Sequence, residues 1–164
     1  MAHQAGSAAD LERLMEEYGT GLLRLCALQL GDAALAEDAA QETLLRAWRR
    51  YGTFREAAAE RTWITAIALN VCRDLLRSPW HTRRMELSAL AEPSAEDAPW
   101  DDTPLRAVLS LPRKYREVVL LRYDEEVTLE EIADTLGVAP GTGSARLTQA
   151  KRKLRPMLEE WYYD

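Results

Sequence analysis

The residues of this chain that could do chemistry are few, and their types favour binding over catalysis. The sequence of 164 residues has only two histidines, His3 and His81, and both fall in segments that we expect to be flexible. Glu37 and Asp38 do not form a catalytic carboxylate pair, because adjacent residues on a helix point to different faces. The sequence has no phosphate-binding glycine loop, metal-ligand cluster or nucleophile motif. We therefore expect no enzyme activity, and no metal or cofactor.

The segment from Thr128 to Leu154 has the pattern of a helix-turn-helix. Thr128 and Glu131 have the spacing of a capping box, which marks the start of a helix. Gly137 can adopt the left-handed backbone that ends this helix. Pro140 suits the start of the next helix, because its missing N–H does no harm there. The second helix of such a motif fits the major groove of DNA, so the pattern predicts a DNA-binding domain.

The expected outward face of this second helix carries side chains that can read DNA. Arg146 can donate two hydrogen bonds to guanine, and Gln149 can read adenine. Lys151 and Arg152 would meet phosphates, which adds affinity without sequence information. Gly143 departs from the pattern, because a buried branched residue is expected there and glycine costs about 1 kcal/mol relative to alanine inside a helix. We therefore expect a domain that is weakly stable or that is ordered by DNA or by a protein partner.

Charge is segregated along the chain, although the net charge is only −6. Residues 1–42 hold two basic and eight acidic residues, whereas residues 43–84 hold nine arginines and three acids. Residues 85–105 hold six acids and no base, and residues 140–156 hold five bases and no acid. Basic blocks attract phosphate, and acidic blocks repel it or bind basic proteins. The alternative interpretation is a set of solvated helix faces that cluster by chance.

Hydrophobic residues at steps of three and four predict three helices in the first half and no strands. The first helix is expected to have Asp10 as its N-cap and to end at Gly31. The second stripe runs from Ala36 to Tyr51, and the third runs from Trp63, expected in the core, to Leu75. An irregular loop is expected between the second and third helices. The predicted fold class is all-α.

Cysteine usage and hydropathy indicate the compartment. Cys26 and Cys72 both lie within apolar helical patterns, so we interpret them as buried free thiols in a reducing environment. The chain has no run of about 18 apolar residues, which a membrane span would need. The N-terminus also lacks the basic stretch and apolar core of a secretion signal. These features predict a cytoplasmic protein without membrane insertion.

Residues 79–104 have the composition of a linker. They include four prolines and six acids, with too little apolar surface to fold alone. Beyond them, helices are expected at about 104–110, 113–123, 128–136 and 141–160. We predict two small helical domains joined by a flexible acidic linker, the second domain being the helix-turn-helix. The predicted boundaries are 1–78, 79–104 and 105–164.

Two parts of the chain resemble the conserved domains of the extracytoplasmic-function (ECF) sigma factors of the sigma-70 family. In the first part the resemblance is carried by Leu30–Trp48 and Arg61–Arg77, and in the second by Leu111–Arg155. The two parts follow the order of the family, with a linker between them. The resemblance implies a factor that binds core RNA polymerase and directs promoter-specific transcription initiation.

The resemblance implies which residues contact the polymerase. The helix over residues 35–50 is expected to dock on the coiled coil of the largest subunit, and the flap is a second expected contact. The implied docking residues are Glu37, Asp38, Gln41, Glu42 and Arg46. Acids on an exposed face can pair with basic residues of a partner. Without the resemblance these side chains would be interpreted as a solvated helix face.

The resemblance also divides promoter recognition between the two domains. The loop from Tyr51 to Glu60 is expected to capture a flipped base of the minus-ten element. The implied minus-ten residues are Phe54, Arg55, Arg61, Asn70, Arg73 and Arg77. The implied minus-thirty-five residues are Thr142, Ser144, Ala145, Arg146, Thr148, Gln149, Lys151 and Arg152. Around Gly143 the sequence departs from the family pattern, so a base preference cannot be transferred.

Other partners and functions remain open at this stage. ECF sigma factors are commonly held by an anti-sigma factor, so such a partner is expected. The linker is expected either to thread the polymerase channels or to act as a passive tether. A stand-alone helix-turn-helix regulator would bind duplex DNA without polymerase, and the basic block at residues 43–84 argues against it. A protein-interaction adaptor would make no DNA contact.

Overall fold

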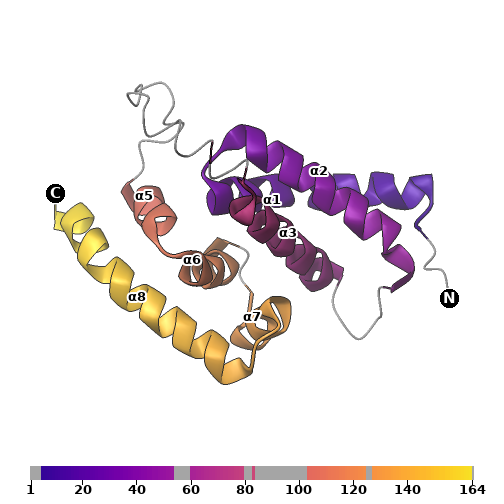
Figure 1. Cartoon of the computed structure of the whole chain (residues 1–164). Helices are drawn as coiled ribbons and strands as arrows, with labels where there is room; N and C mark the ends of the chain where they lie inside the picture. Colours follow the sequence, from indigo (N-terminus) through magenta and orange to yellow (C-terminus); the bar gives the residue numbers. More distant parts are fainter. Residues whose placement is uncertain (1–4, 54–59, 80–82, 84–102, 125–126, 164) are drawn as a thin grey trace.

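A computed structural model describes residues 5–53, 60–79, 83, 103–124 and 127–163, and every regular element among them is helical (Figure 1). The first half contains α1 (Ala8–Leu30), α2 (Ala33–Arg49), a 3-10 turn (Tyr51–Thr53) and α3 (Glu60–Arg77). The second half contains α5 (Thr103–Ser110), α6 (Arg113–Val119), a π-helical turn (Leu120–Asp124), α7 (Leu129–Leu136) and α8 (Pro140–Tyr163). The all-α prediction is confirmed.

The first helix begins earlier than the sequence analysis predicted. Ser7 is the N-cap, and its Oγ accepts a hydrogen bond from the Asp10 amide at 3.2 Å. The Asp10 carboxylate accepts a hydrogen bond from the Ser7 amide at 2.8 Å, which completes a capping box. The prediction of Asp10 as N-cap is wrong, because an acid three residues after a serine serves as the far side of that box. Gly31, with φ of 68°, ends α1 as predicted.

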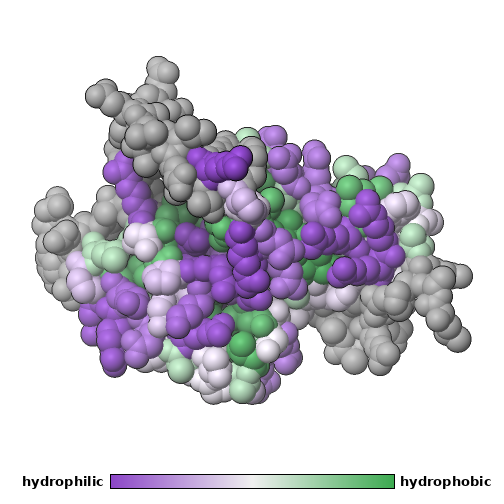
Figure 2. Space-filling view, in the orientation of Figure 1, coloured by the Kyte–Doolittle hydropathy of each residue, from purple (hydrophilic) through white to green (hydrophobic). Residues whose placement is uncertain are grey.

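The first half is a bundle of three helices that pack against one another. Leu14, Leu25 and Ile64 are among the largest fully buried side chains of this bundle. The α2 helix faces its neighbours with small side chains such as Ala36 and Ala47, both fully buried. Small residues let helix backbones approach closely, so α2 can lie against both α1 and α3. Hydrophilic side chains cover much of the surface seen in Figure 2.

In the second half, the shorter helices pack along the length of α8 (Figure 1). The predicted helix at 113–123 ends instead in a π-helical turn that begins at Leu120. The predicted helix at 141–160 extends from Pro140 to Tyr163 and passes through Pro156. Pro156 cannot donate a backbone hydrogen bond, but it lies on an exposed face where water can satisfy the carbonyl left without a donor.

The two halves pack against each other. The α3 helix lies against α7, and α1 lies against α5 and α6. Buried side chains of both halves form one continuous cluster, so their apolar surfaces meet. Cys26 and Cys72 are buried free thiols, as predicted. No helix in the described parts of the chain is long and apolar enough to cross a membrane.

Candidate polymerase and promoter interfaces

The α2 helix presents an exposed face opposite its buried alanines. Three of the five predicted docking residues, Glu37, Asp38 and Gln41, are exposed on α2. Leu45 follows Gln41 by four residues and is 36% exposed, so it extends the same face. The sequence analysis did not select Leu45. The signal was present, because Leu45 lies outside the stripe that periodicity assigns to the core.

The other two predicted docking residues contact each other. Arg46 Nε donates to Glu42 Oε1 at 2.9 Å, and Arg46 Nη1 lies 3.4 Å from Asp74 Oδ2 on α3. The hydrogen bond to Glu42, with a smaller contribution from Asp74, raises the pKa of Arg46 above its ordinary value. Arg46 therefore links α2 to α3 and holds Glu42 in place beside the exposed face.

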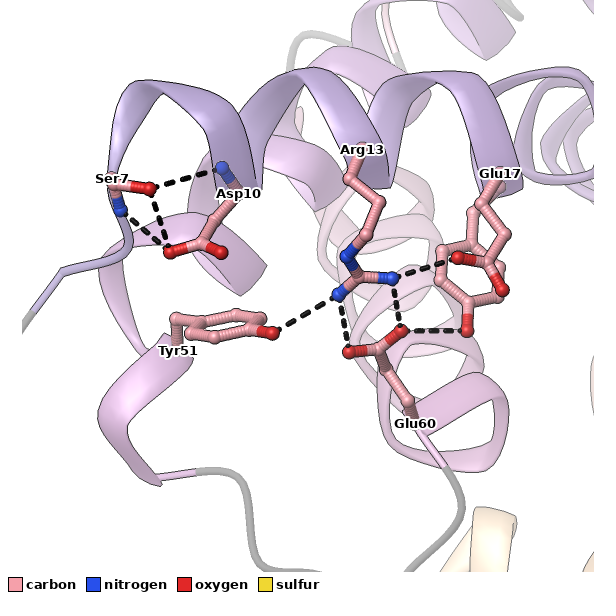
Figure 3. A network of polar contacts seen from close by, with 7 residues as sticks. Ser7, Asp10, Arg13, Glu17, Tyr51 and Glu60 are labelled. Carbon is pink, nitrogen blue, oxygen red and sulfur yellow. Dashed lines mark hydrogen bonds and ion pairs between the residues drawn. The ribbon is translucent and has the colours of Figure 1, made fainter.

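A polar network joins the two ends of the predicted base-capture loop to α1 (Figure 3). Arg13 donates to both carboxylate oxygens of Glu60, at 2.9 and 2.7 Å, and to the Tyr51 hydroxyl at 3.0 Å. Tyr18 donates to Glu60 at 2.8 Å. The Arg13 hydrogen bonds are the main reason that the pKa of Glu60 is held below its ordinary value. Tyr51 and Glu60 flank residues 54–59, so Arg13 fixes where the chain leaves and re-enters the helical bundle. The predicted stacking residue Phe54 and its neighbour Arg55 lie outside the described residues.

The predicted minus-ten residues of α3 do not all share one exposed surface. Arg61, Asn70 and Arg77 are exposed. Arg73 is only 20% exposed, and its guanidinium binds Glu117 of α6 in the second half of the chain. Trp63, expected in the core, is partly buried and packs against it. The sequence analysis did not foresee a contact between Arg73 and the second half.

The predicted helix-turn-helix is formed by α7 and α8. Thr128 Oγ1 accepts from the Glu131 amide at 3.2 Å, and the Glu131 carboxylate accepts from the Thr128 amide at 3.3 Å. Gly137 has φ of 68° and ends α7 in the left-handed conformation. Gly143 is buried where α8 crosses α7, and a Cβ added there would lie 3.7 Å from Ala133. Such a Cβ makes an ordinary contact, so the expected branched residue would reach further toward the α7 backbone.

The start of α8 exposes most of the side chains predicted to contact DNA. The exposed members are Thr142, Ser144, Ala145, Thr148, Gln149, Lys151 and Arg152. Arg146 is partly buried and lines an open depression of about 430 Å³ together with Gln149. Lys114 and Tyr115 of α6 line the same depression. The ammonium groups of Lys114 and Lys153 lie 5.0 and 5.5 Å from the centre of the Tyr115 ring, so positive charge gathers around this aromatic side chain.

Comparison with known proteins gives a family match for each half of the chain. Residues 14–82 match sigma-70 region 2, and residues 105–154 match sigma-70 region 4. The ECF RNA polymerase sigma factor SigL of Mycobacterium tuberculosis is 33% identical, in an alignment covering 95% of this chain and 93% of SigL. This chain belongs to the ECF sigma factors of the sigma-70 family. SigW of Bacillus subtilis, also an ECF RNA polymerase sigma factor, is 27% identical over 90% of this chain and 88% of its own length.

Solved structures share the fold of this sigma factor. The sigma factor RpoE of Bartonella quintana, in complex with the anti-sigma factor NepR, gives a TM-score of 0.74 at 21% identity. That match covers 93% of this chain and 98% of RpoE. CnrH, in complex with the cytosolic domain of CnrY, gives a TM-score of 0.71 at 24% identity, covering 94% of this chain and 91% of CnrH.

The activity of this sigma factor follows from its family membership. It binds core RNA polymerase and directs promoter-specific transcription initiation. Nothing in these comparisons supports the stand-alone regulator considered from the sequence. The region 2 match begins within α1 and includes α2 and α3, and the region 4 match begins within α5 and ends within α8. The predicted docking and minus-ten residues therefore lie in region 2, and the predicted minus-thirty-five residues lie in region 4.

Proposed function

We propose that the exposed face of α2 is the surface by which this sigma factor docks on the coiled coil of the largest polymerase subunit. The exposed apolar side chain of Leu45 lies one turn beyond polar Gln41 and two turns beyond acidic Asp38 on the same face. An apolar contact beside polar and charged groups is the usual composition of a protein interface. Glu37, Glu42 and Arg46 complete the proposed docking surface, with Arg46 holding Glu42 in position.

In this proposal, region 2 reads the minus-ten element. Arg61, Asn70 and Arg77 are exposed on α3, and Arg73 would join them on DNA. The loop that carries Phe54 and Arg55 would supply the base-stacking residue, as loops with an aromatic side chain do for single-stranded DNA. The support from the described residues is the Arg13 network, which fixes both ends of this loop to the bundle.

Region 4 would read the minus-thirty-five element by placing α8 in the major groove. The observation that carries this assignment is the exposure of polar side chains on successive turns at the start of α8, soon after the turn at Gly137. Arg146 and Gln149 would contact base edges, whereas Lys151 and Arg152 would contact phosphates. The polymerase flap would be the protein partner of region 4.

Further parts of the proposal concern regulation and location. The sigma factor RpoE was solved with the anti-sigma factor NepR bound, and CnrH, which has the same fold, was solved with the cytosolic domain of CnrY. We expect a comparable anti-sigma factor to bind this chain. Because its polymerase and chromosome targets lie in the cytoplasm, the chain would act there, by binding alone and without a catalytic group of its own. The domain boundaries 1–78, 79–104 and 105–164 remain part of the proposal, as does a linker that threads the polymerase.

Transcription with core polymerase and genomic DNA tests the proposal, with the 5′ ends of the transcripts mapped by sequencing. We expect new start sites that share two upstream motifs. Gln149→Ala and Arg146→Ala should relax the base preference within the upstream motif, by about 1–3 kcal/mol for each base contact that is lost. Arg155→Ala, an exposed change further along α8, is the matched control and should leave the preference unchanged. If new start sites appear but neither Gln149→Ala nor Arg146→Ala changes the base preference in the upstream motif, these two side chains of α8 do not read bases.

A further inference from the structure

The depression beside the proposed reading helix is lined partly by α6, which lies outside the helix-turn-helix. The α6 helix packs against α8 (Figure 1), and the depression of about 430 Å³ opens between them. Lys114 and Tyr115 of α6 form one wall, and Arg146 and Gln149 are among the α8 residues that form the other. A ligand in this depression would therefore touch α6 and both proposed base readers of α8 at once.

Positive charge gathers around the depression, and none of the described residues that line it is acidic. Lys114 and Lys153 are exposed, and their ammonium groups lie 5.0 and 5.5 Å from the centre of the Tyr115 ring. Arg146 adds a guanidinium to the wall. Arg73 of α3, by contrast, is bound to a carboxylate. The three cations of the depression therefore favour an anionic ligand.

The α8 helix has a contact between a lysine and a tyrosine on each of two opposite sides. Lys151 and Lys153 are two residues apart, so they project from the helix at about 200° to each other. Lys153 lies near Tyr115 of α6, whereas the ammonium group of Lys151 lies 6.0 Å from the centre of the Tyr123 ring. A helix in the major groove has a phosphate backbone on each side, and this arrangement of lysines fits both.

We propose that Lys114 of α6 and Lys153 of α8 bind the phosphate backbone of one strand of the upstream promoter element, one phosphate each. This inference rests on the proposed function, because it takes α8 to lie in the major groove. Tyr115 would hold both ammonium groups in place through their attraction to its ring. Such contacts add affinity without sequence information, and they extend the DNA surface of region 4 beyond the helix-turn-helix.

The lining of the depression fits nucleic acid better than an acidic segment of a protein. A protein interface usually centres on large apolar side chains, and the described lining has none apart from the ring of Tyr115. Arg146 and Gln149 share the depression with Lys114, so the DNA that they are proposed to read would pass beside the two lysines.

Lys114→Gln tests the phosphate contacts, because Lys114 is exposed and its replacement removes charge without disturbing the core. The probe is a fluorescein-labelled DNA duplex of random sequence, titrated with the full chain at several salt concentrations and followed by anisotropy. The affinity should fall several-fold at low salt, and the slope of its logarithm against that of the salt concentration should shrink by about 0.9, the value for one phosphate contact. Lys153→Gln should have the same effect.

Two further variants show whether the effect is local. Lys114→Arg keeps the positive charge, so it should retain the wild-type slope. Arg24→Gln removes one exposed positive charge from α1 and is the matched control, which should also retain that slope. An equal loss of slope in Arg24→Gln and Lys114→Gln would overturn the proposal, because it would reflect net charge alone.

An unchanged affinity and slope in both Lys114→Gln and Lys153→Gln would also overturn the phosphate contacts. If these two variants instead co-elute less with core polymerase than the wild type does, the depression binds a protein. The base preference of Gln149→Ala in the transcription experiment reports on the proposed function separately, since the random duplex contains no promoter. A changed preference in Gln149→Ala together with an unchanged slope in the lysine variants would therefore leave the proposed function intact.

Discussion

Two charge clusters in this sigma factor each centre on one glutamate, and they differ in burial and in balance. The Glu60 cluster joins elements within region 2, with one arginine and a tyrosine hydroxyl donating to a carboxylate that is 17% exposed. The Glu117 cluster joins region 2 to region 4, with three arginines around a carboxylate that is 0% exposed. The first cluster lies inside one half, with two acids on one arginine, whereas the second lies between the halves, with three arginines beside one acid.

The comparison separates a contact within one half of the chain from a contact between the two halves. In the Glu60 cluster Arg13 pairs with Glu60 of α3 and with Glu17 of its own helix. In the Glu117 cluster Arg73 and Arg113 share one buried acid, and the neighbouring Arg116 donates to the Leu109 carbonyl instead. The first cluster holds an element of the proposed minus-ten site in place, and the second covers a residue of the same site.

The largest expected loss of stability comes from the ion pair between the two halves of the chain. Arg73→Ala removes two charge-assisted hydrogen bonds to a buried carboxylate, which should lower the free energy of unfolding by about 3 kcal/mol. Urea unfolding followed by circular dichroism measures this loss. Arg77→Ala, an exposed change one turn further along α3, is the control and should stay within about 0.5 kcal/mol of the wild type. Equal losses in both variants would show that the Glu117 contact adds no stability.

A smaller effect is expected in the Glu60 cluster. Arg13→Ala should lower the free energy of unfolding by about 1–2 kcal/mol, less than the usual sum of its charged hydrogen bonds, because the Arg13 side chain is 41% exposed. Denaturant unfolding measures it, with the exposed Arg49→Ala as control. A loss as large as that of Arg73→Ala would contradict the contrast between the two clusters.

The Arg13 effect should also depend on pH, through Glu60. Its pKa is held below its ordinary value of 4.5, mainly by the hydrogen bonds from Arg13. A depressed carboxyl pKa contributes stability that is complete above the ordinary value and is lost as the pH falls through the folded value. The stability difference between wild type and Arg13→Ala should thus stay constant from neutral pH to about 4.5 and shrink below it. Urea unfolding at neutral pH and below pH 4.5 measures this difference. The same difference in stability at both pH values would refute this role of Glu60.

The smallest expected effect concerns the surplus charge itself. Arg116→Met removes a guanidinium whose Nε has no partner and keeps an apolar side chain of similar length. The lost hydrogen bond to the Leu109 carbonyl, at 3.0 Å, and the lost attraction to Glu117 are offset because a buried guanidinium no longer has to leave water, so stability should stay within about 1 kcal/mol of the wild type. A loss of several kcal/mol in thermal or urea unfolding would show that the cluster needs all three positive charges.

Local signals in the sequence predicted much of the fold. The capping box at Thr128, the left-handed glycines at Gly31 and Gly137 and the buried stripe of α2 follow from contacts within a few residues, so periodicity and capping rules find them. Asp10 was assigned the wrong role because two capping residues, Ser7 and Asp10, lie three positions apart and either could begin a helix. The π-helical turn at Leu120 carries no local signal that the sequence analysis could use.

The candidate interfaces were predictable to the extent that they lie on single helices. Exposure of Asp38, Gln41 and Gln149 follows from the faces that their helices bury. The depression beside Lys114 and Tyr115 was not foreseen, because it requires α6 to lie next to the start of α8. The roles of these residues in binding stay a prediction until the transcription experiment is done.

The sequence by itself determined the all-α fold class, the helix-turn-helix, the segregation of charge and, through its motifs, the resemblance to ECF sigma factors. Only the tertiary structure decided that Arg73 meets Glu117 and that Arg13 meets Glu60. These partners lie 44 and 47 residues apart. Local rules describe forces that act over one or two helical turns, whereas the pairing of distant charges depends on how whole helices pack.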